Sequence, residues 1–360
     1  MGMKREKRLQ ASFITLFSRH REIGLVLILL VLIGVVGLRN PLFLTGDKML
    51  FILKDTAPLF VLAAGMMCVL LVGSIDISVT GIMALSAMIA AMMMRNSLTV
   101  SDTTVLVDGL ETAVRVKTGM PLLFTVLIAM GIGGLCGALN GVVIAYGRVL
   151  PVVTTLGMQY ILYGFAHVVS DGQAVYKKDM TDSFVAFART DVLGINTQTW
   201  IMLLCLLLVF LFVTYFRAGR HLYAVGSNRE AAEMRGINAN RTILLAHILM
   251  GVLAGLAGMM FGSHDTKITQ DLKMGYEMYV IAACVIGGVS VTGGSGKITA
   301  VLLGALMIGV INNGLPMMRL TGEAEFWKKL IQGLLILIAV VSNVLLRRVN
   351  IRRELKRRKI

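Results

Sequence analysis

The feature that most constrains this chain is a series of apolar runs, each about as long as a bilayer is thick. A helix needs about 20 apolar residues to cross the hydrocarbon core, and helices satisfy their backbone polar groups internally where water is absent. Hydrophobic residues make up 56% of the 360 residues and charged residues only 15%, which excludes an ordinary soluble domain. The sequence therefore predicts an all-α, polytopic membrane protein.

About ten crossings can be placed along the chain. The predicted transmembrane helices are 23–39, 56–73, 76–94, 121–146, 151–169, 199–216, 242–262, 276–291, 298–314 and 327–346. We expect one transmembrane domain over residues 1–360, with a basic tail at each end, 1–22 and 347–360, and a charged segment at 217–241 between two crossings. Two other segments between crossings, 95–120 and 171–199, are long enough to hold short structured elements.

The net charge of +15 falls on one side of this topology. An even number of crossings places both tails and segment 217–241 together, and these parts hold most of the lysines and arginines. The segments on the opposite side carry no net charge. This asymmetry is the positive-inside bias of membrane proteins. It predicts that both termini are cytoplasmic, and it explains the charge without a nucleic acid partner.

Glycines recur at helical spacing in two of the runs. They are Gly133, Gly134, Gly137 and Gly141 in the fourth, and Gly251, Gly255, Gly258 and Gly262 in the seventh. Small residues let helix backbones approach closely inside a membrane, so we expect close helix packing here. Glycines also end two runs in a comparable way, at 72–79 and 286–291, which predicts broken helices and suggests an internal repeat.

No pattern typical of a catalytic or metal centre occurs in the sequence. Each of the four cysteines stands alone within an apolar run, which favours packing over disulfides or metal ligation. The glycine-rich segment 287–297 lacks the residues of a phosphate-binding loop, so we interpret it as a tight turn. We expect no enzyme activity, no cofactor and no metal.

Few polar side chains interrupt the apolar runs, and these are the candidates for a solute pathway or for helix packing. For Asp76 we favour a helix cap that accepts the N–H groups of Ser78 and Val79 over a pathway role. His167 and His247 have no carboxylate near them in sequence, so we favour hydrogen-bonded packing over proton relay. The candidates for a pathway or structural role are Asp76, Ser78, Asn140, Gln159, His167, Asn312 and Asn313.

The charged segment 217–241 contains a short predicted helix that ends at a glycine. The residues of interest are Asn228, Arg229, Glu230, Ala231, Ala232, Glu233, Arg235 and Gly236. Glycine is typical of the position just after a helix. The segment is either an ordinary amphipathic loop or the surface through which the membrane part contacts a soluble partner.

Five motifs in one order resemble the permease subunits of ribose-type ABC importers. They lie at 75–79, 154–157, 226–237, 281–290 and 309–315, so the resemblance spans nearly the whole chain. Members of that family carry ribose, galactose, xylose, rhamnose and the sugar-like autoinducer-2. The resemblance implies an ABC importer permease fold with broken helices, in the bacterial cytoplasmic (inner) membrane.

The resemblance also implies the partners. A separate ATPase subunit with two nucleotide-binding cassettes would hydrolyse ATP, an extracytoplasmic binding protein would deliver the monosaccharide, and a second permease copy, identical or paralogous, would complete the pore. Residues 227–240 would form the coupling helix, with Arg229, Glu230, Glu233 and Arg235 exposed to a cassette. Because the binding protein selects the sugar, the permease would need no tight site of its own.

Other classes of protein remain open. A nucleoside or branched-chain amino acid ABC permease shares the general plan. An ion-coupled secondary transporter should carry paired carboxylates or broken helices dedicated to an ion, and only Asp76 is available. A membrane scaffold explains the glycines but not the charged segment.

Overall fold

The computed structural model describes residues 21–107 and 110–318, together with residues 326, 327, 330, 331, 333, 334 and 337. The described residues divide into two compact units. The larger unit is Ala57–Val280 with Ser290–Ser295; the smaller unit takes in the described residues up to Thr56, Ile281–Val289 and those from Gly296 on. Each unit is considered by itself below.

Helices dominate both units, as predicted. The α-helices are α2 (Arg21–Arg39), α3 (Gly46–Leu71), α4 (Val79–Asn96), α5 (Leu122–Ala145), α6 (Pro151–Val169), α7 (Asp182–Phe187), α8 (Thr197–Tyr215), α9 (Arg217–Ser227), α10 (Arg229–Met234), α11 (Ala239–Asp265), α12 (Glu277–Ile286) and α13 (Ile298–Met317). Two short 3-10 helices are η1 (Pro41–Leu44) and η2 (Lys177–Asp179).

The described residues include six strands in three antiparallel pairs. They are β1 (Thr99–Val107) with β2 (Leu110–Thr118), β3 (Val175–Tyr176) with β6 (Lys267–Ile268), and β4 (Asp191–Val192) with β5 (Ile195–Asn196). The segments 95–120 and 171–199 therefore hold short structured elements, as the sequence predicts.

Eight of the described helices are long and apolar enough to cross a membrane. They are α2, α3, α4, α5, α6, α8, α11 and α13, and they match eight of the predicted crossings. The predicted crossing at 327–346 falls almost entirely outside the described residues. The tails 1–22 and 347–360 also lie outside them, apart from Arg21 and Glu22.

The predicted crossing at 276–291 is wrong in length. Its helix, α12, has ten residues and spans about 15 Å at 1.5 Å per residue, half of a hydrocarbon core of about 30 Å. The helix ends because Gly288 takes a φ of +83°, and the N–H of Val289 returns to the carbonyl of Cys284 at 2.9 Å. This is the glycine-terminated helix end called a Schellman motif.

The end of α3 has the same geometry. Gly73 has a φ of +77°, and the N–H of Ser74 returns to the carbonyl of Val69 at 3.1 Å. The predicted similarity between segments 72–79 and 286–291 is therefore confirmed for their local backbone. Residues 72–78 then run without regular structure before α4 begins.

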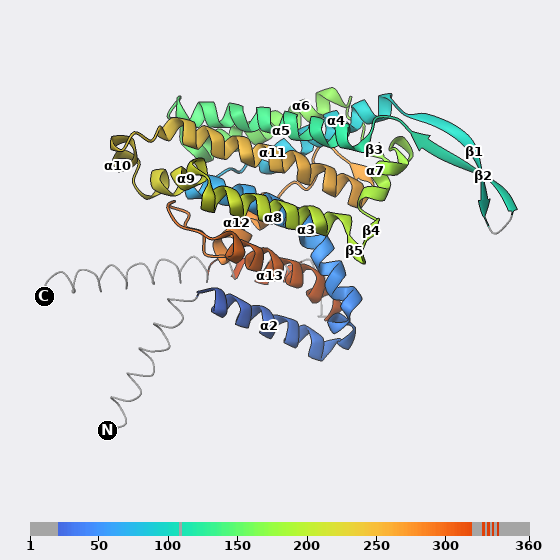
Figure 1. The fold of residues 1–360 in the computed structure, drawn as a ribbon, viewed down its shortest axis with the longest axis horizontal. Coiled ribbons are helices and arrows are strands. Elements are labelled where there is room, and N and C mark those ends of the chain that lie inside the picture. Colours follow the sequence, from blue (N-terminus) through green and yellow to red (C-terminus); the bar gives the residue numbers. More distant parts are fainter. Residues whose placement is uncertain are drawn as a thin grey trace, which may run out of the picture. The chain divides into compact units, whose positions relative to one another are not determined.

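In the larger unit, α5 and α11 lie side by side with their backbones in contact (Figure 1). A Cβ atom on Gly133 would collide with the carbonyl of Gly251, and one on Gly137 with the carbonyl of His247. Likewise, a Cβ atom on Gly255 would collide with the carbonyl of Ala129. The glycine spacing thus predicted close packing correctly.

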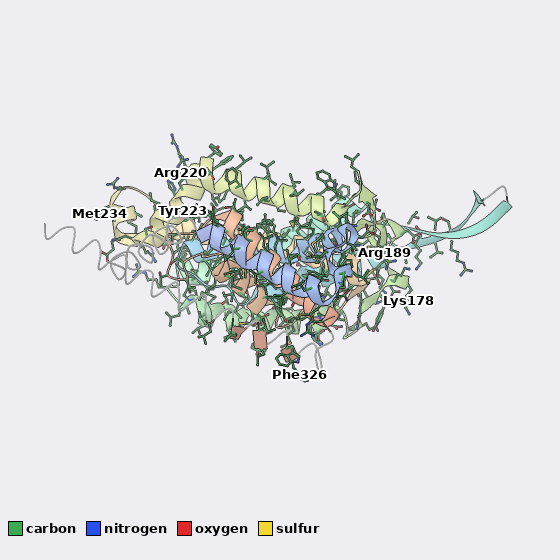
Figure 2. All side chains as sticks on the ribbon, turned by 90° about the horizontal axis from the view of Figure 1, so that it is seen from below. Lys178, Arg189, Arg220, Tyr223, Met234 and Phe326 are labelled. Carbon is green, nitrogen blue, oxygen red and sulfur yellow. The ribbon has the colours of Figure 1, made fainter. Side chains whose placement is uncertain are left out.

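The two ends of the larger unit differ. Helices α9 and α10 lie at one end, and the β1–β2 hairpin projects from the opposite end (Figure 1). Figure 2 shows Arg220 and Met234 at the first end and Lys178 and Arg189 at the second. The charged segment 217–241 is therefore separated from the hairpin by the length of the transmembrane helices of this unit.

The smaller unit has its own apolar core. Val36, Phe43, Ile52 and Val310 are buried together there, joining α2, η1 and the first part of α3 to α13. Gly314 on α13 leaves space for Val36 and Phe43, which a Cβ atom would contact.

Candidate functional site

The charged end of the larger unit is an ordered structure. Asn228 caps α10, because its Oδ1 accepts the N–H of Ala231 at 3.0 Å. The helix ends at Gly236, whose φ is +80°, and the N–H of Ile237 returns to the carbonyl of Ala232 at 3.1 Å. The predicted short helix and its glycine stop are confirmed.

The side chains of α10 divide into a buried and an exposed face. Ala232 is buried against the rest of the unit, whereas Arg229, Glu230, Glu233 and Arg235 are exposed, as predicted. Arg229 donates from Nε to Glu233 Oε1 at 3.1 Å and from Nη2 to Asn240 Oδ1 at 2.7 Å. These contacts link the exposed face of α10 to the start of α11.

Sequence reasoning missed one residue of this exposed face. Met234 is 83% exposed, and Figure 2 shows it at the tip of this end. An apolar side chain surrounded by charges is typical of the anchor residue in a protein interface. Its position in sequence between the charged residues Glu233 and Arg235 could have indicated that Met234 is exposed.

Glycines join the charged end to the end of α3. We call Gly73, Gly226, Gly293 and Gly294 the glycine junction. The N–H of Gly294 donates to the carbonyl of Leu71 at 3.0 Å, and a Cβ atom on Gly226 would collide with that same carbonyl. The glycine-rich segment is therefore a tight turn, as predicted, and it holds α9 against α3 through backbone contacts.

A pocket opens beside this junction. Its volume is about 320 Å³, and its lining includes Ser74, Arg148, Val225 and Arg229. The charged end, the α5–α6 turn and the segment after α3 therefore share one hollow at this end of the larger unit.

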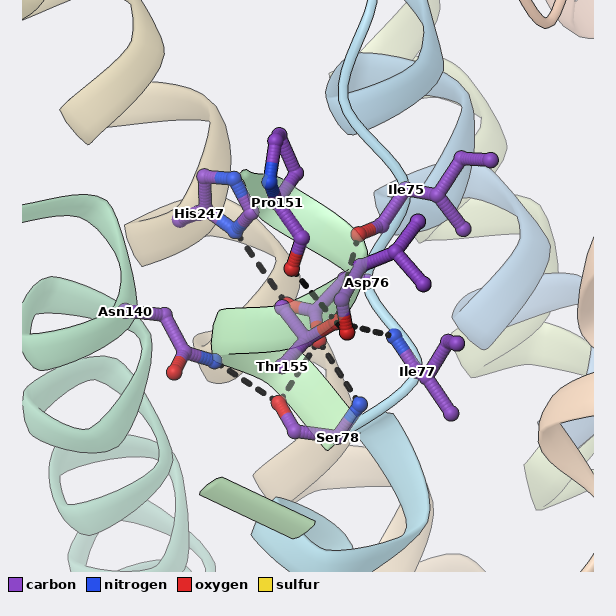
Figure 3. A network of polar contacts seen from close by, with 9 residues as sticks. Ile75, Asp76, Ile77, Ser78, Asn140, Pro151, Thr155 and His247 are labelled. Atoms are coloured by element: carbon purple, nitrogen blue, oxygen red, sulfur yellow. Dashed lines mark hydrogen bonds and ion pairs between the residues drawn. The ribbon is translucent and has the colours of Figure 1, made fainter. Parts of the chain in front are cut away.

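The irregular segment after α3 is held by buried polar side chains (Figure 3). The N–H of Ser78 donates to Asp76 Oδ1 at 2.9 Å, and the N–H of Ile77 donates to Thr155 Oγ1 at 3.1 Å. Irregular backbone at membrane depth is tolerated only where its polar groups find partners inside the protein. Asp76 and Thr155 supply those partners.

Asp76 also connects three elements. Its Oδ1 accepts the hydroxyl of Ser78 at 2.6 Å, and its Oδ2 lies 3.2 Å from Nδ1 of His247 on α11. The hydroxyl of Ser78 accepts Nδ2 of Asn140 on α5 at 2.7 Å. All four side chains are fully buried, so α4, α5 and α11 meet at this carboxylate (Figure 3).

These contacts revise the prediction for Asp76 in two ways. Asp76 accepts the N–H of Ser78, as predicted. However, the N-cap residue of α4 is Ser78. The described contacts include no hydrogen bond from the Val79 N–H to Asp76. His247 has no carboxylate near it in sequence, but the folded chain brings Asp76 to it, a contact that agrees with hydrogen-bonded packing. The partner lies 171 residues away, so no local pattern could have identified it.

A second polar cluster lies at the start of α4. Thr80 Oγ1 donates to Glu277 Oε2 at 2.8 Å and accepts Nε2 of Gln159 at 3.0 Å. Gln159 was a predicted candidate, whereas Thr80, Tyr163 and Glu277 were missed. A carboxylate at the head of an apolar run was a usable signal for Glu277, because ionisable groups in membrane segments mark functional sites.

The remaining candidates have no hydrogen bond to the side chains of either cluster among the described contacts. His167 is exposed on α6, with Nδ1 3.0 Å from the carbonyl of Tyr163. In the smaller unit, Asn313 donates to Asp55 Oδ2 at 2.8 Å and accepts Lys48 Nζ at 3.4 Å, and Asn312 is half-buried. Among the described residues, no group of three His, Cys, Asp or Glu side chains could hold a metal ion.

Helices of membrane length, broken helices and an ordered charged end define a multi-pass membrane protein. The family model described as "Branched-chain amino acid transport system / permease component" matches residues 48–340. The chain belongs to this family of transport permeases.

Curated relatives include several sugar permeases. The ribose import permease protein of Escherichia coli is 33% identical over 315 residues, which cover 87% of this chain and 90% of the relative. The D-allose transport system permease protein of Escherichia coli is 32% identical over 324 residues, which cover 90% of this chain and 91% of the relative. The galactose/methyl galactoside import permease protein of Escherichia coli is 30% identical over 330 residues, which cover 90% of this chain and 94% of the relative. No solved structure matches this chain significantly.

Proposed function

We propose that this chain is the transmembrane permease subunit of an ATP-driven importer and that its solute is a monosaccharide. The family description names branched-chain amino acids, but the relatives described above are named for ribose, allose and galactose. Their identity extends along about nine-tenths of both chains, which favours a sugar over an amino acid or a nucleoside.

The single observation that carries the proposal is the backbone contact between the charged end and the break after α3. In this proposal α10 is the coupling helix, which docks on one cassette of a separate ATPase subunit. The glycine junction leaves no side chain between Gly226 and Leu71. A displacement of α10 and α9 is then passed directly to the segment that carries Asp76.

The remaining partners follow from this assignment. The α10 end and both termini are cytoplasmic, and residues 1–360 form one permease domain in the bacterial inner membrane. An extracytoplasmic binding protein delivers the sugar at the hairpin end of the larger unit, and a second permease copy completes the pore. ATP is hydrolysed by the cassettes, so this chain is a transporter subunit.

A proton relay through Asp76 and His247 fits their surroundings less well than a structural role. A proton carrier has to exchange protons with water, yet Asp76 and His247 are both 0% exposed. Both oxygens of Asp76 already have partners within the chain. This arrangement favours a structural role for the pair.

Charge reversal on α10 tests the proposal. We expect Glu230→Lys combined with Glu233→Lys to abolish sugar uptake and co-purification of the ATPase, because both side chains are exposed and Glu233 orients Arg229. Uptake is measured in cells, and co-purification is measured from detergent-solubilised membranes. The amount of permease in the membrane should not change.

The matched control reverses two exposed acids at the other end of the larger unit, Asp171→Lys with Asp271→Lys. The ATPase should still co-purify with this variant. If the α10 variant retained both uptake and the ATPase, the coupling role would be wrong.

A further inference from the structure

The second polar cluster lies deep within the larger unit. Gln159 is the ninth of the 19 residues of α6, so it is about 12 Å from the start of the helix and about 15 Å from its end. Thr80 and Glu277 are joined to it by hydrogen bonds. The cluster is therefore near mid-depth, where transporters commonly hold their solutes at the ends of discontinuous helices.

The cluster has hydrogen-bonding capacity that the chain does not use. Glu277 receives one hydrogen bond, from Thr80, although a carboxylate can accept about four. Among the described residues, no basic side chain forms an ion pair with Glu277. Tyr163 lies one helical turn after Gln159 on the same face of α6. Its buried hydroxyl lies close to the side chains of Thr80 and Gln159, but it forms no hydrogen bond of good geometry with them.

Accessibility separates this cluster from the network around Asp76. Gln159, Tyr163 and Glu277 keep 5%, 7% and 8% of their surface exposed, whereas Thr80, Asp76, Ser78 and Asn140 keep none. The second cluster is therefore buried, but less completely than the first. A small movement of α6 or α12 would admit a solute to the second cluster.

We propose that Glu277, Tyr163 and Gln159 form a binding site for the hydroxyl groups of a neutral polyhydroxylated solute. The carboxylate accepts hydrogen bonds from two neighbouring hydroxyls, the phenol donates to an oxygen of the solute, and the amide completes the set. The uncompensated carboxylate repels phosphorylated or carboxylated solutes. This site rests on the proposed function, but it adds solute contacts within the permease itself.

Tyr163→Phe tests the site, because it removes only the phenol oxygen, which forms no hydrogen bond of good geometry within the chain, and keeps the ring. The permease is reconstituted in proteoliposomes with its ATPase and ribose-loaded binding protein, and the number of ribose molecules taken up per ATP hydrolysed is measured. We expect about a tenfold lower ratio, the size of effect expected for one lost hydrogen bond. ATP hydrolysis stimulated by the binding protein should persist, because α10 is unchanged.

Two further variants complete the experiment. Glu277→Gln should also lower the ratio, whereas Tyr160→Phe, on the same helix but 61% exposed, should leave it unchanged. The thermal unfolding midpoint of Tyr163→Phe should equal or exceed that of the wild type. A lower midpoint would reveal a structural partner for the hydroxyl and overturn the site, as would an unchanged transport ratio.

The experiment separates the site from the function on which it rests. If the wild-type complex takes up none of ribose, allose and galactose, the monosaccharide assignment fails. If the wild type transports one of them and Tyr163→Phe transports it equally well, only the site is wrong.

Discussion

Asp76 is the residue on which the break between α3 and α4 depends. Its carboxylate accepts hydrogen bonds from the backbone N–H and the hydroxyl of Ser78, at the start of α4, and contacts the imidazole of His247 on α11. Burying a charge at this depth costs free energy, and these contacts offset that cost. The residue therefore stabilises an irregular backbone that the membrane interior would otherwise disfavour.

Two substitutions at Asp76 should differ sharply. Asp76→Ala leaves Ser78 and His247 with unsatisfied polar groups, each costing about 1–3 kcal/mol when buried, so we expect a much lower thermal unfolding midpoint in detergent. Asp76→Asn keeps one acceptor oxygen for Ser78, and His247 can accept the amide N–H by changing its tautomer. We expect this variant to keep most of its stability and substantial transport. A stable Asp76→Asn protein without transport would instead indicate a pathway role.

Prediction from sequence had a clear limit at the residue scale. Asp76, Asn140 and Gln159 stood out because they are polar residues in apolar runs, and all three are buried at helix contacts. Their partners did not stand out. The bond between Thr80 and Glu277 joins residues 197 positions apart, and only the folded chain brings such residues together.

At the scale of elements, the pairing of α5 with α11 shows what a residue pattern can predict. Glycines spaced by about one turn form a stripe on each helix, and the structure brings both stripes into backbone contact. The glycines at 286–291 predicted a break near the end of α12, but they did not show that the helix is too short to cross the membrane. A single backbone angle at Gly288 ends that helix.

Two glycines on α5 provide a matched test of this pairing. Gly137→Ala should destabilise the protein by about 1–3 kcal/mol, the usual cost of overpacking, because its Cβ would collide with the carbonyl of His247. Gly131→Ala has no atom within 4 Å of its Cβ and should stabilise α5 by up to about 1 kcal/mol through helix propensity. Thermal unfolding of the two variants in one detergent measures the difference. Equal effects at both positions would contradict backbone contact as the reason for the glycines.

For the whole molecule, hydropathy was enough to identify eight membrane-length helices, because crossing a bilayer places a strong demand on composition. Orientation rests on the distribution of charge, which is a weaker signal. The larger unit supplies two reporters of orientation at opposite ends, α10 and the β1–β2 hairpin (Figure 1).

Thiol labelling in intact cells tests the orientation. All four native cysteines are buried, so an introduced exposed cysteine should be labelled selectively. A membrane-impermeant maleimide should label Ser101→Cys in the hairpin but should not label Glu230→Cys until the membrane is permeabilised. The reverse pattern would place α10 outside the cell, where no ATPase could reach it.

The backbone contact between α5 and α11 limits how this protein can move. Any transporter must part some of its helices to let a solute through, but two helices whose main chains touch cannot separate without leaving an empty gap that no side chain is there to fill. We therefore expect these two helices to move together, and the gate to form along the faces of other helices.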